Sequence, residues 1–178
     1  MKGGRMGRIV LAVLLSVVFM STALFAQVKE IKIGVLYPMS GAQATIGRDL
    51  QRAAELTADI INNKTPGVEV PMAQWGGIPN LGGAKIKLIF ADHRGEPDRG
   101  ADLAKKLILD DKVVGLMGAY QSSVTKTVSA VAERYGIPMI NDSSTSPDLT
   151  KRGFKWFWRT TPHDEYFNRD LFELLKGL

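Results

Sequence analysis

Two clusters of hydroxyl side chains are the residues best suited to contact a ligand. Ser122 and Ser123 follow the apolar run "VVGLMGAY", and Ser144 and Thr145 follow a second apolar run within "NDSSTSP". Each cluster precedes a stretch with helical character, so hydroxyl donors and free backbone N–H groups would gather at the same points. Such donors, without a dedicated lysine or arginine, suit a carboxylate. The Ser144 carbonyl could accept from an ammonium group, so an amino acid zwitterion would satisfy both halves.

Helix capping is the alternative role for these hydroxyls, because serine and threonine commonly bond to the backbone at helix starts. Ser146 followed by Pro147 has the pattern of an N-cap with proline at the first helical position. Spacing alone leaves both roles open. The expected meeting of two clusters at one sheet edge is the observation that favours ligand binding.

Catalytic motifs are absent from the sequence. Ser122 is preceded by Ala-Tyr-Gln, whereas the nucleophile elbow of α/β hydrolases needs a G-x-S-x-G turn. His93 and His163 lie in predicted turns without an evident nucleophile partner. The acidic residues around His93 fit no metal-ligand spacing, so this segment is interpreted as a solvated turn. "GAQATIGRD" matches no nucleotide-binding glycine motif. No catalytic residue, metal or cofactor is expected.

The first 26 residues have the organisation of a secretory signal peptide. Three basic residues precede an apolar run from Ile9 to Met20, and Ala23 and Ala26 offer two candidate cleavage sites. A membrane anchor is the alternative, but the run is shorter than the roughly 20 residues that a spanning helix needs. The predicted location is therefore the periplasm.

Composition agrees with an exported protein. The chain has no cysteine, so it can carry neither a disulfide nor a lipid-modified cysteine. Three of its 23 basic residues lie in the signal peptide, which leaves 20 against 18 acidic residues. Because these charges are scattered along the chain, no nucleic-acid-binding surface is expected.

Strands and helices are predicted to alternate after residue 27. Short apolar runs predict strands at 31–38, 84–92, 113–120 and 137–142, and a fifth at 154–160 with Phe154, Trp156 and Trp158 on one face. Helical spacing of apolar residues predicts helices at 46–63, at 97–111 and after Ser122. This alternation predicts an α/β fold, a doubly wound, mostly parallel sheet with helices on both faces. Both hydroxyl clusters should then lie at the carboxyl edge of the sheet, where ligands bind.

The segment from Lys64 to Gly83 is long for a connection in a compact domain. Its glycines and prolines argue against regular structure over most of its length. It is interpreted as a surface insertion, with a flap near the ligand edge as the alternative.

Three segments carry further motifs in a fixed order: "IKIGVLYPMSGAQATIGRDLQRAAELTADIIN", "KLIFADHRGEPDRGADLAKKLI" and "GIPMINDSSTSPDLTKRGFKWFWRT". They contain P-x-S-G after the first strand, D-x-x-x-x-P after the second and the hydroxyl-rich turn after the fourth. Together they resemble the leucine/branched-chain amino-acid-binding family. Its members are periplasmic substrate-binding proteins of ABC transporters with the type 1 periplasmic-binding-protein fold.

The resemblance implies a role for each hydroxyl residue. Ser122 and Thr145 would bind the ligand carboxylate, and the Ser144 carbonyl would accept from the ammonium group. Ser123 is a weaker candidate. The position in the first turn that often carries an aromatic ring over the ligand is Ile46 here, which leaves the preferred ligand side chain open.

The resemblance also implies two α/β lobes joined by three crossover segments, with the ligand held between them. Residues 27–160 would form the first lobe, which the family completes after the second. Residues 161–178 would begin a truncated second lobe, because relatives are much longer. The expected function is delivery of an amino acid of branched-chain type, or a similar small carboxylate, to an ABC permease. The alternatives are an amide, urea or amino-acid sensor of the same fold and, more remotely, a secreted serine hydrolase using Ser122.

Overall fold

The computed structural model describes residues 29–178. The predicted signal peptide at residues 1–26 lies outside the described residues. Within residues 29–178, no helix has the length and apolar character needed to cross a membrane.

A five-stranded parallel sheet organises the described chain. Its strands are β1 (Glu30–Tyr37), β2 (Lys85–Asp92), β3 (Gly115–Gly118), β4 (Met139–Asn141) and β5 (Phe157–Arg159). They lie in the order β2-β1-β3-β4-β5. The chain therefore moves outward from β1 in both directions, which is the doubly wound arrangement. The predicted fold class is confirmed.

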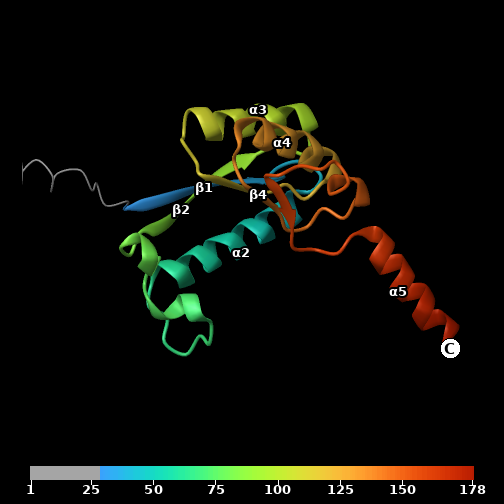
Figure 1. Cartoon of the computed structure of the whole chain (residues 1–178), viewed down its shortest axis with the longest axis horizontal. Helices are drawn as coiled ribbons and strands as arrows, with labels where there is room; N and C mark the ends of the chain where they lie inside the picture. The colour runs from blue at the N-terminus through green and yellow to red at the C-terminus, as the bar shows by residue number, and fades with distance from the viewer. Residues whose placement is uncertain (1–28) are drawn as a thin grey trace, which may run out of the picture.

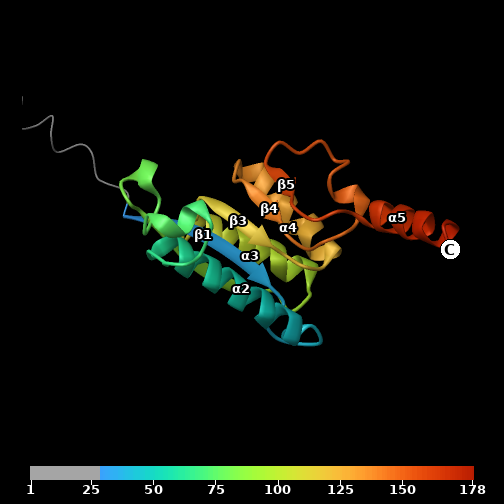
Figure 2. The same ribbon diagram turned by 90° about the horizontal axis from the view of Figure 1, so that it is seen from below.

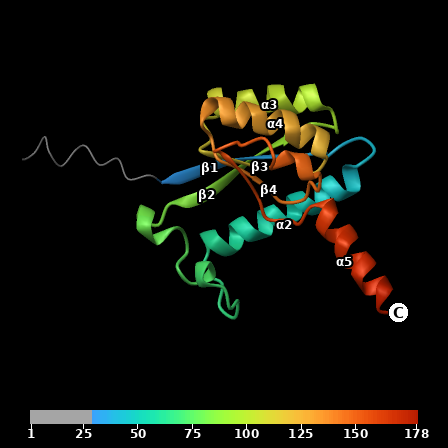
Figure 3. The same cartoon turned by 45° about the vertical axis from the view of Figure 1, so that its right-hand side comes forward.

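Helices cover the two faces of this sheet unequally. α2 (Ala44–Asn62) packs over β1 and β2 on one face, whereas α3 (Pro97–Leu109) and α4 (Ser122–Tyr135) lie side by side on the other (Figures 1 and 3). α4 ends where Gly136 adopts a φ of 65°, a left-handed conformation open to glycine without steric cost. Each of these helices follows a strand in sequence, as predicted.

The main core lies between the sheet and the α3–α4 pair. Leu36, Leu116, Met139 and Phe157 come from four neighbouring strands and are all buried in this cluster. The predicted fifth strand is shorter than expected, because β5 begins only at Phe157. Its core residue is Phe157, whereas Trp158 points to the opposite face and is 50% exposed.

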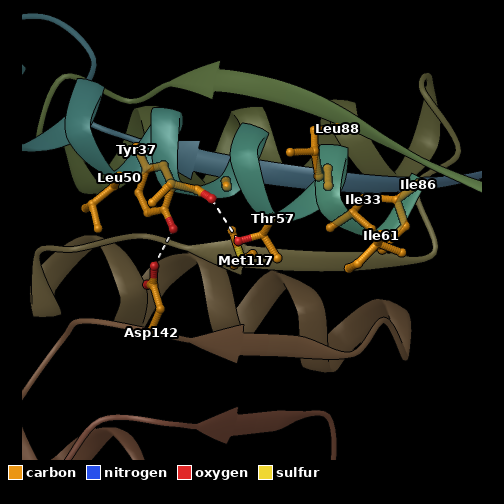
Figure 4. A pocket seen from close by; sticks show the side chains of 12 residues that line it. Ile33, Tyr37, Leu50, Thr57, Ile61, Ile86, Leu88, Met117 and Asp142 are labelled. Atoms are coloured by element: carbon orange, nitrogen blue, oxygen red, sulfur yellow. Dashed lines mark hydrogen bonds between the residues drawn. The ribbon is translucent and has the colours of Figure 1, made fainter. Parts of the chain in front are cut away.

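The face that carries α2 is only partly covered. Met117, Ile140 and Trp158 are cross-strand neighbours on this face, and Ile140 is 45% exposed. Between α2 and the sheet lies a cavity of about 300 Å³, whose apolar walls include Ile33 and Leu88 (Figure 4). Parallel sheets are normally buried on both faces. The second face of this sheet is therefore incomplete within residues 29–178.

The segment from Lys64 to Gly83 lies at the edge opposite to the hydroxyl clusters. It joins the end of α2 to the amino end of β2 and contains two short 3-10 helices, η2 (Pro71–Gln74) and η3 (Pro79–Leu81). Figure 2 shows it beside the start of β1. It is a surface insertion, and the alternative of a flap near the ligand edge is wrong.

α5 (Asp164–Lys176) extends away from the sheet and has no buried residue (Figure 1). Its first turn is attached to the rest of the chain at two points. The backbone N–H of Asp164 donates to the Thr145 carbonyl at 3.0 Å, and Lys151 Nζ lies 3.1 Å from a Glu165 carboxylate oxygen. The assignment of residues 161–178 to a second lobe stays a prediction.

Substitutions at two adjacent residues of β4 would test which face of the sheet holds the core. Met139 is fully buried, so Met139→Ala should lower the free energy of unfolding by about 2–5 kcal/mol. Ile140 is half-exposed on the other face, so Ile140→Ala should cost about 1 kcal/mol or less. Urea unfolding followed by circular dichroism measures both losses. Equal losses would contradict the placement of the core on the α3–α4 side.

Candidate ligand-binding site

The two hydroxyl-rich turns lie side by side at the carboxyl edge of the sheet. Ser122 begins α4 directly after the β3 turn, and residues 143–146 follow β4. The backbone N–H of Ser146 donates to Ser122 Oγ at 3.2 Å. The two turns therefore touch, which is the arrangement that a shared ligand edge requires.

Ser144 connects the two turns from inside the protein. Its side chain is 1% exposed; its hydroxyl donates to the Tyr120 carbonyl at 2.8 Å and lies 2.5 Å from Thr125 Oγ1. This hydroxyl, which the sequence suggested as a ligand donor, is thus occupied within the protein. The Ser144 carbonyl accepts from Asn141 Nδ2 at 2.8 Å, which leaves one lone pair for another donor.

The other residues suggested by the sequence are more accessible. Ser123 is exposed in the first turn of α4, and Thr145 is half-buried. Ile46, in the first turn of α2, is 40% exposed. Ser146 is the N-cap residue of the 3-10 helix η4 (Pro147–Leu149), as predicted, although its side chain makes no capping bond. The ligand contacts of Ser122, Ser123 and Thr145 stay a prediction.

A hollow of about 290 Å³ beside α4 is lined by Ser122 and Ser123. The sequence led us to expect no basic residue here, but Lys126 and Arg152 also line this hollow. The Arg152 guanidinium donates to the carbonyls of Leu149 and Lys126 and to Ser129 Oγ. Because these bonds occupy all three nitrogens, Arg152 supports the turn and adds positive charge near the Ser122 hydroxyl.

His93 holds the turns after β2 and β3 together. Its side chain is fully buried, so the interpretation of this segment as a solvated turn is wrong for His93. The Gly95 N–H donates to Nδ1 at 3.0 Å, so the hydrogen lies on Nε2, which donates to the Ala119 carbonyl at 2.9 Å. Burial lowers the pKa of His93, and a neutral ring is the form that both bonds require.

Two carboxylates tie the turn after β1 to its neighbours. Asp92 accepts from the Ser40 hydroxyl and, at 3.3 Å, from the Ser40 backbone N–H. Burial alone would raise the pKa of Asp92, but these bonds and one from the Arg94 N–H outweigh it and lower the pKa.

Asp142 in the β4 turn accepts from the phenol of Tyr37 at the end of β1 (Figure 4). Burial, followed by the negative charge of Asp142, raises the pKa of Tyr37, so the phenol keeps its proton. Sequence reasoning missed this pair, because the two residues are far apart in the chain and belong to no motif.

The edge therefore offers hydrogen-bond donors and acceptors held by buried contacts. Among residues 29–178, no group of three or more histidine, cysteine, aspartate or glutamate side chains is placed to hold a metal ion. Such a surface can bind and orient a small polar molecule.

A family model described as "Periplasmic binding protein" matches residues 30–168. The chain belongs to that family. Its members bind ligands and are not enzymes, so the serine hydrolase alternative is rejected. The resemblance to the leucine/branched-chain amino-acid-binding proteins is confirmed by curated relatives and by solved structures.

Two curated relatives illustrate the similarity. Leu/Ile/Val-binding protein homolog 3 of Brucella melitensis is 33% identical over 86% of this chain and 38% of its own length. A protein of Pseudomonas aeruginosa named "Amino acid binding protein" is 35% identical over 90% of this chain and 38% of its own length. The periplasmic binding protein described here thus spans about two-fifths of each relative.

Two solved structures share the fold. The substrate-binding protein LivJ of Streptococcus pneumoniae, in complex with isoleucine, superposes with a TM-score of 0.65 at 32% identity, over 76% of this chain and 35% of LivJ. An ABC transporter substrate-binding protein of Desulfitobacterium hafniense, in complex with Leu, gives a TM-score of 0.65 at 27% identity, over 82% of this chain and 38% of that protein.

The stability of the binding protein should depend on the protonation of His93. The unfolded chain takes up a proton on this ring below its ordinary pKa of 6.5, whereas burial lowers the pKa in the folded protein. The stability contributed by the neutral ring is therefore present above the unfolded pKa of 6.5 and is lost progressively as the pH falls below it. His93→Gln should lack this acid-dependent loss of melting temperature.

The other histidine supplies the control. His163→Gln leaves His93 in place and should retain the wild-type dependence of melting temperature on pH. The role of His93 would be refuted if His163→Gln, and not His93→Gln, removed that dependence.

Proposed function

We propose that this chain is the ligand-binding part of a periplasmic solute-binding protein that supplies an amino acid of branched-chain type to an ABC permease. The observation that carries the proposal is the contact between the two hydroxyl-rich turns, Ser146 N–H to Ser122 Oγ, at the carboxyl edge of the sheet. Relatives named for binding Leu, Ile and Val, and similar structures in complex with isoleucine and Leu, support the ligand class.

The carboxylate of the ligand would lie between the two turns. Ser122 and Thr145 would donate to it, aided by the unpaired backbone N–H groups at the start of α4. Ser123 is a secondary candidate. The ammonium group would bind to the Ser144 carbonyl, whose second lone pair is left by the bond from Asn141.

The rest of the ligand would be held by a second lobe. The chain spans 38% of the first relatives, and the incomplete face of the sheet supports a first lobe at residues 27–160 that further chain completes. Residues 161–178 would begin the second lobe, and closure of the lobes on the ligand would be the state that the permease recognises. Export through the signal peptide at residues 1–26 would place the protein in the periplasm.

The chain by itself should bind weakly. A hydrogen bond to a charged group contributes about 1.5–3 kcal/mol, and micromolar affinity needs roughly 8 kcal/mol beyond the entropy lost on association. Three or four such bonds supply roughly 5–12 kcal/mol, and association consumes about 4–15 kcal/mol, so bonds at an open edge do not reach micromolar affinity. We therefore expect the dissociation constant of L-leucine to be about millimolar or weaker, and calorimetry that gave a micromolar value would contradict this.

The ligand site is tested by the substitution Ser122→Ala, with Ser123→Ala as the matched control. Loss of the Ser122 hydroxyl removes a donor to the carboxylate and should weaken L-leucine binding by about tenfold or more. Loss of the exposed Ser123 hydroxyl should change affinity by about twofold or less. Titrations followed by ¹H–¹⁵N NMR measure both, with melting temperatures as a check on folding. Equal effects of the two substitutions would place the carboxylate elsewhere.

A further inference from the structure

The turn that leads into Ser122 has a backbone conformation that must be held in place. Tyr120 has a φ of 71°, in the left-handed region that residues with a Cβ atom seldom occupy. Tyr120 lies between the buried Ala119 and the start of α4. The direction in which Ser122 points therefore depends on what fixes the Ala119–Tyr120 segment.

A directed chain of hydrogen bonds closes around this segment. The Ala119 N–H donates to Thr125 Oγ1 at 3.2 Å, and the Ser144 hydroxyl donates to the Tyr120 carbonyl at 2.8 Å. A hydroxyl has one hydrogen. Since Ser144 uses its hydrogen on Tyr120, the 2.5 Å contact between Thr125 and Ser144 must have Thr125 as its donor.

The order of donation is thus fixed from one end to the other. It runs from the Ala119 N–H through the hydroxyls of Thr125 and Ser144 to the Tyr120 carbonyl. This hydrogen-bond chain begins and ends on the same dipeptide, and one of its two middle members, Ser144, belongs to the other hydroxyl-rich turn. Bonds aligned in this way polarise and strengthen one another.

Burial makes this chain costly to break. Thr125 is fully buried and Ser144 is 1% exposed, so water cannot replace a lost partner without opening the turn. The opposite side of Ala119 is held by His93, whose Nε2 donates to the Ala119 carbonyl at 2.9 Å. Side chains from α4, the β4 turn and the β2 turn therefore immobilise one segment.

We propose that Thr125 is a positioning residue for ligand binding. It contacts no ligand; through Ser144 it fixes the Ser122 turn and the Thr145 turn at the separation that a carboxylate spans. This inference rests on the proposed function, since it assumes that those turns bind a carboxylate. Without the Thr125 hydroxyl, both turns gain freedom that the ligand must remove when it binds, which lowers affinity.

Two substitutions at Thr125 test the proposal, with Thr127 as the control. Thr125→Val keeps the shape but removes the hydroxyl, and Thr125→Ser restores the hydroxyl. Thr127 lies on the same helix, and its hydroxyl donates to the Pro97 carbonyl at 2.8 Å, away from both turns. Thr127→Val therefore removes a threonine hydrogen bond of α4 without touching the chain described above.

Affinity for L-leucine is measured by ¹H–¹⁵N NMR titration of the purified chain and each variant. We expect Thr125→Val to weaken binding by about tenfold, Thr125→Ser to bind within about twofold of the wild type, and Thr127→Val to bind like the wild type. Amide hydrogen exchange at residues 120–122 and 144–146 should accelerate in Thr125→Val only. A purely structural role of Thr125 would lower the melting temperature of Thr125→Val and leave the affinity of the folded variant for L-leucine unchanged.

Three results would overturn parts of this account, and they can be told apart. If the wild type binds L-leucine and Thr125→Val binds equally well, Thr125 is not a positioning residue. If Thr127→Val weakens binding as much as Thr125→Val, the effect is general to α4 and the proposal falls. If the wild type shows no chemical-shift change with L-leucine or any other amino acid at concentrations well above the millimolar range, the proposed function fails instead, and this inference with it.

A second variant covers the case in which Thr125→Val does not fold. Ser144→Ala keeps the carbonyl assigned to the ammonium group but interrupts the same hydrogen-bond chain, so it should show the same loss of affinity. When both single variants fold, the double variant should lose little more than either one, because each breaks one shared chain. Additive losses would show that the two hydroxyls act independently.

Discussion

The hydrogen bond between Thr125 and Ser144 joins the first part of α4 to the turn after β4, just beyond the point where β3 and β4 pair. Both hydroxyls are buried, and a buried hydroxyl without a partner costs about 1–3 kcal/mol. Each hydroxyl therefore supplies the other with a hydrogen-bond partner inside the protein. Since Thr125 lies one turn into α4 and Ser144 lies in the β4 turn, satisfying both hydroxyls sets the distance between the β3 and β4 connections. The Ser146 N–H bond to Ser122 Oγ joins the same two turns at a second, less buried point.

Similar contacts extend along the rest of the carboxyl edge. His93 bonds to Ala119, Asp92 to Ser40 and Asp142 to Tyr37, so each turn is fixed by a polar side chain from another. At the amino edge, beside the long segment at 64–83, the Asn62 side chain likewise bonds to the backbone of Ile86. Parallel strands direct all their βα turns to one edge, and precise placement of turns matters where a ligand is bound.

The sequence was sufficient for the features that depend on local patterns. Apolar runs and helical spacing predicted the alternation of strands and helices, and that alternation predicted the sheet. The position of Ser122 at a helix start was also local information. The environment of His93 could not be predicted from local patterns, because its burial depends on Ala119 and on the helices packed above it. The roles of Ser144 and of the Tyr37–Asp142 pair likewise depend on partners 19 to 105 residues away, which no motif records.

The carboxyl edge of the sheet is organised even though one face of the sheet is only partly covered. The apolar surface left open by α2 includes Ile140 and Trp158, but these residues point away from α4. Thr125 lies beside Val124 and Val128, both fully buried against the closed face. The side chains that fix the Ser122 turn are therefore anchored in the half of the molecule whose core is complete. The geometry of the Ser122 turn therefore depends on the α3–α4 side of the sheet, whereas the Tyr37–Asp142 pair lines the cavity on the α2 side and holds the β1 and β4 turns from there.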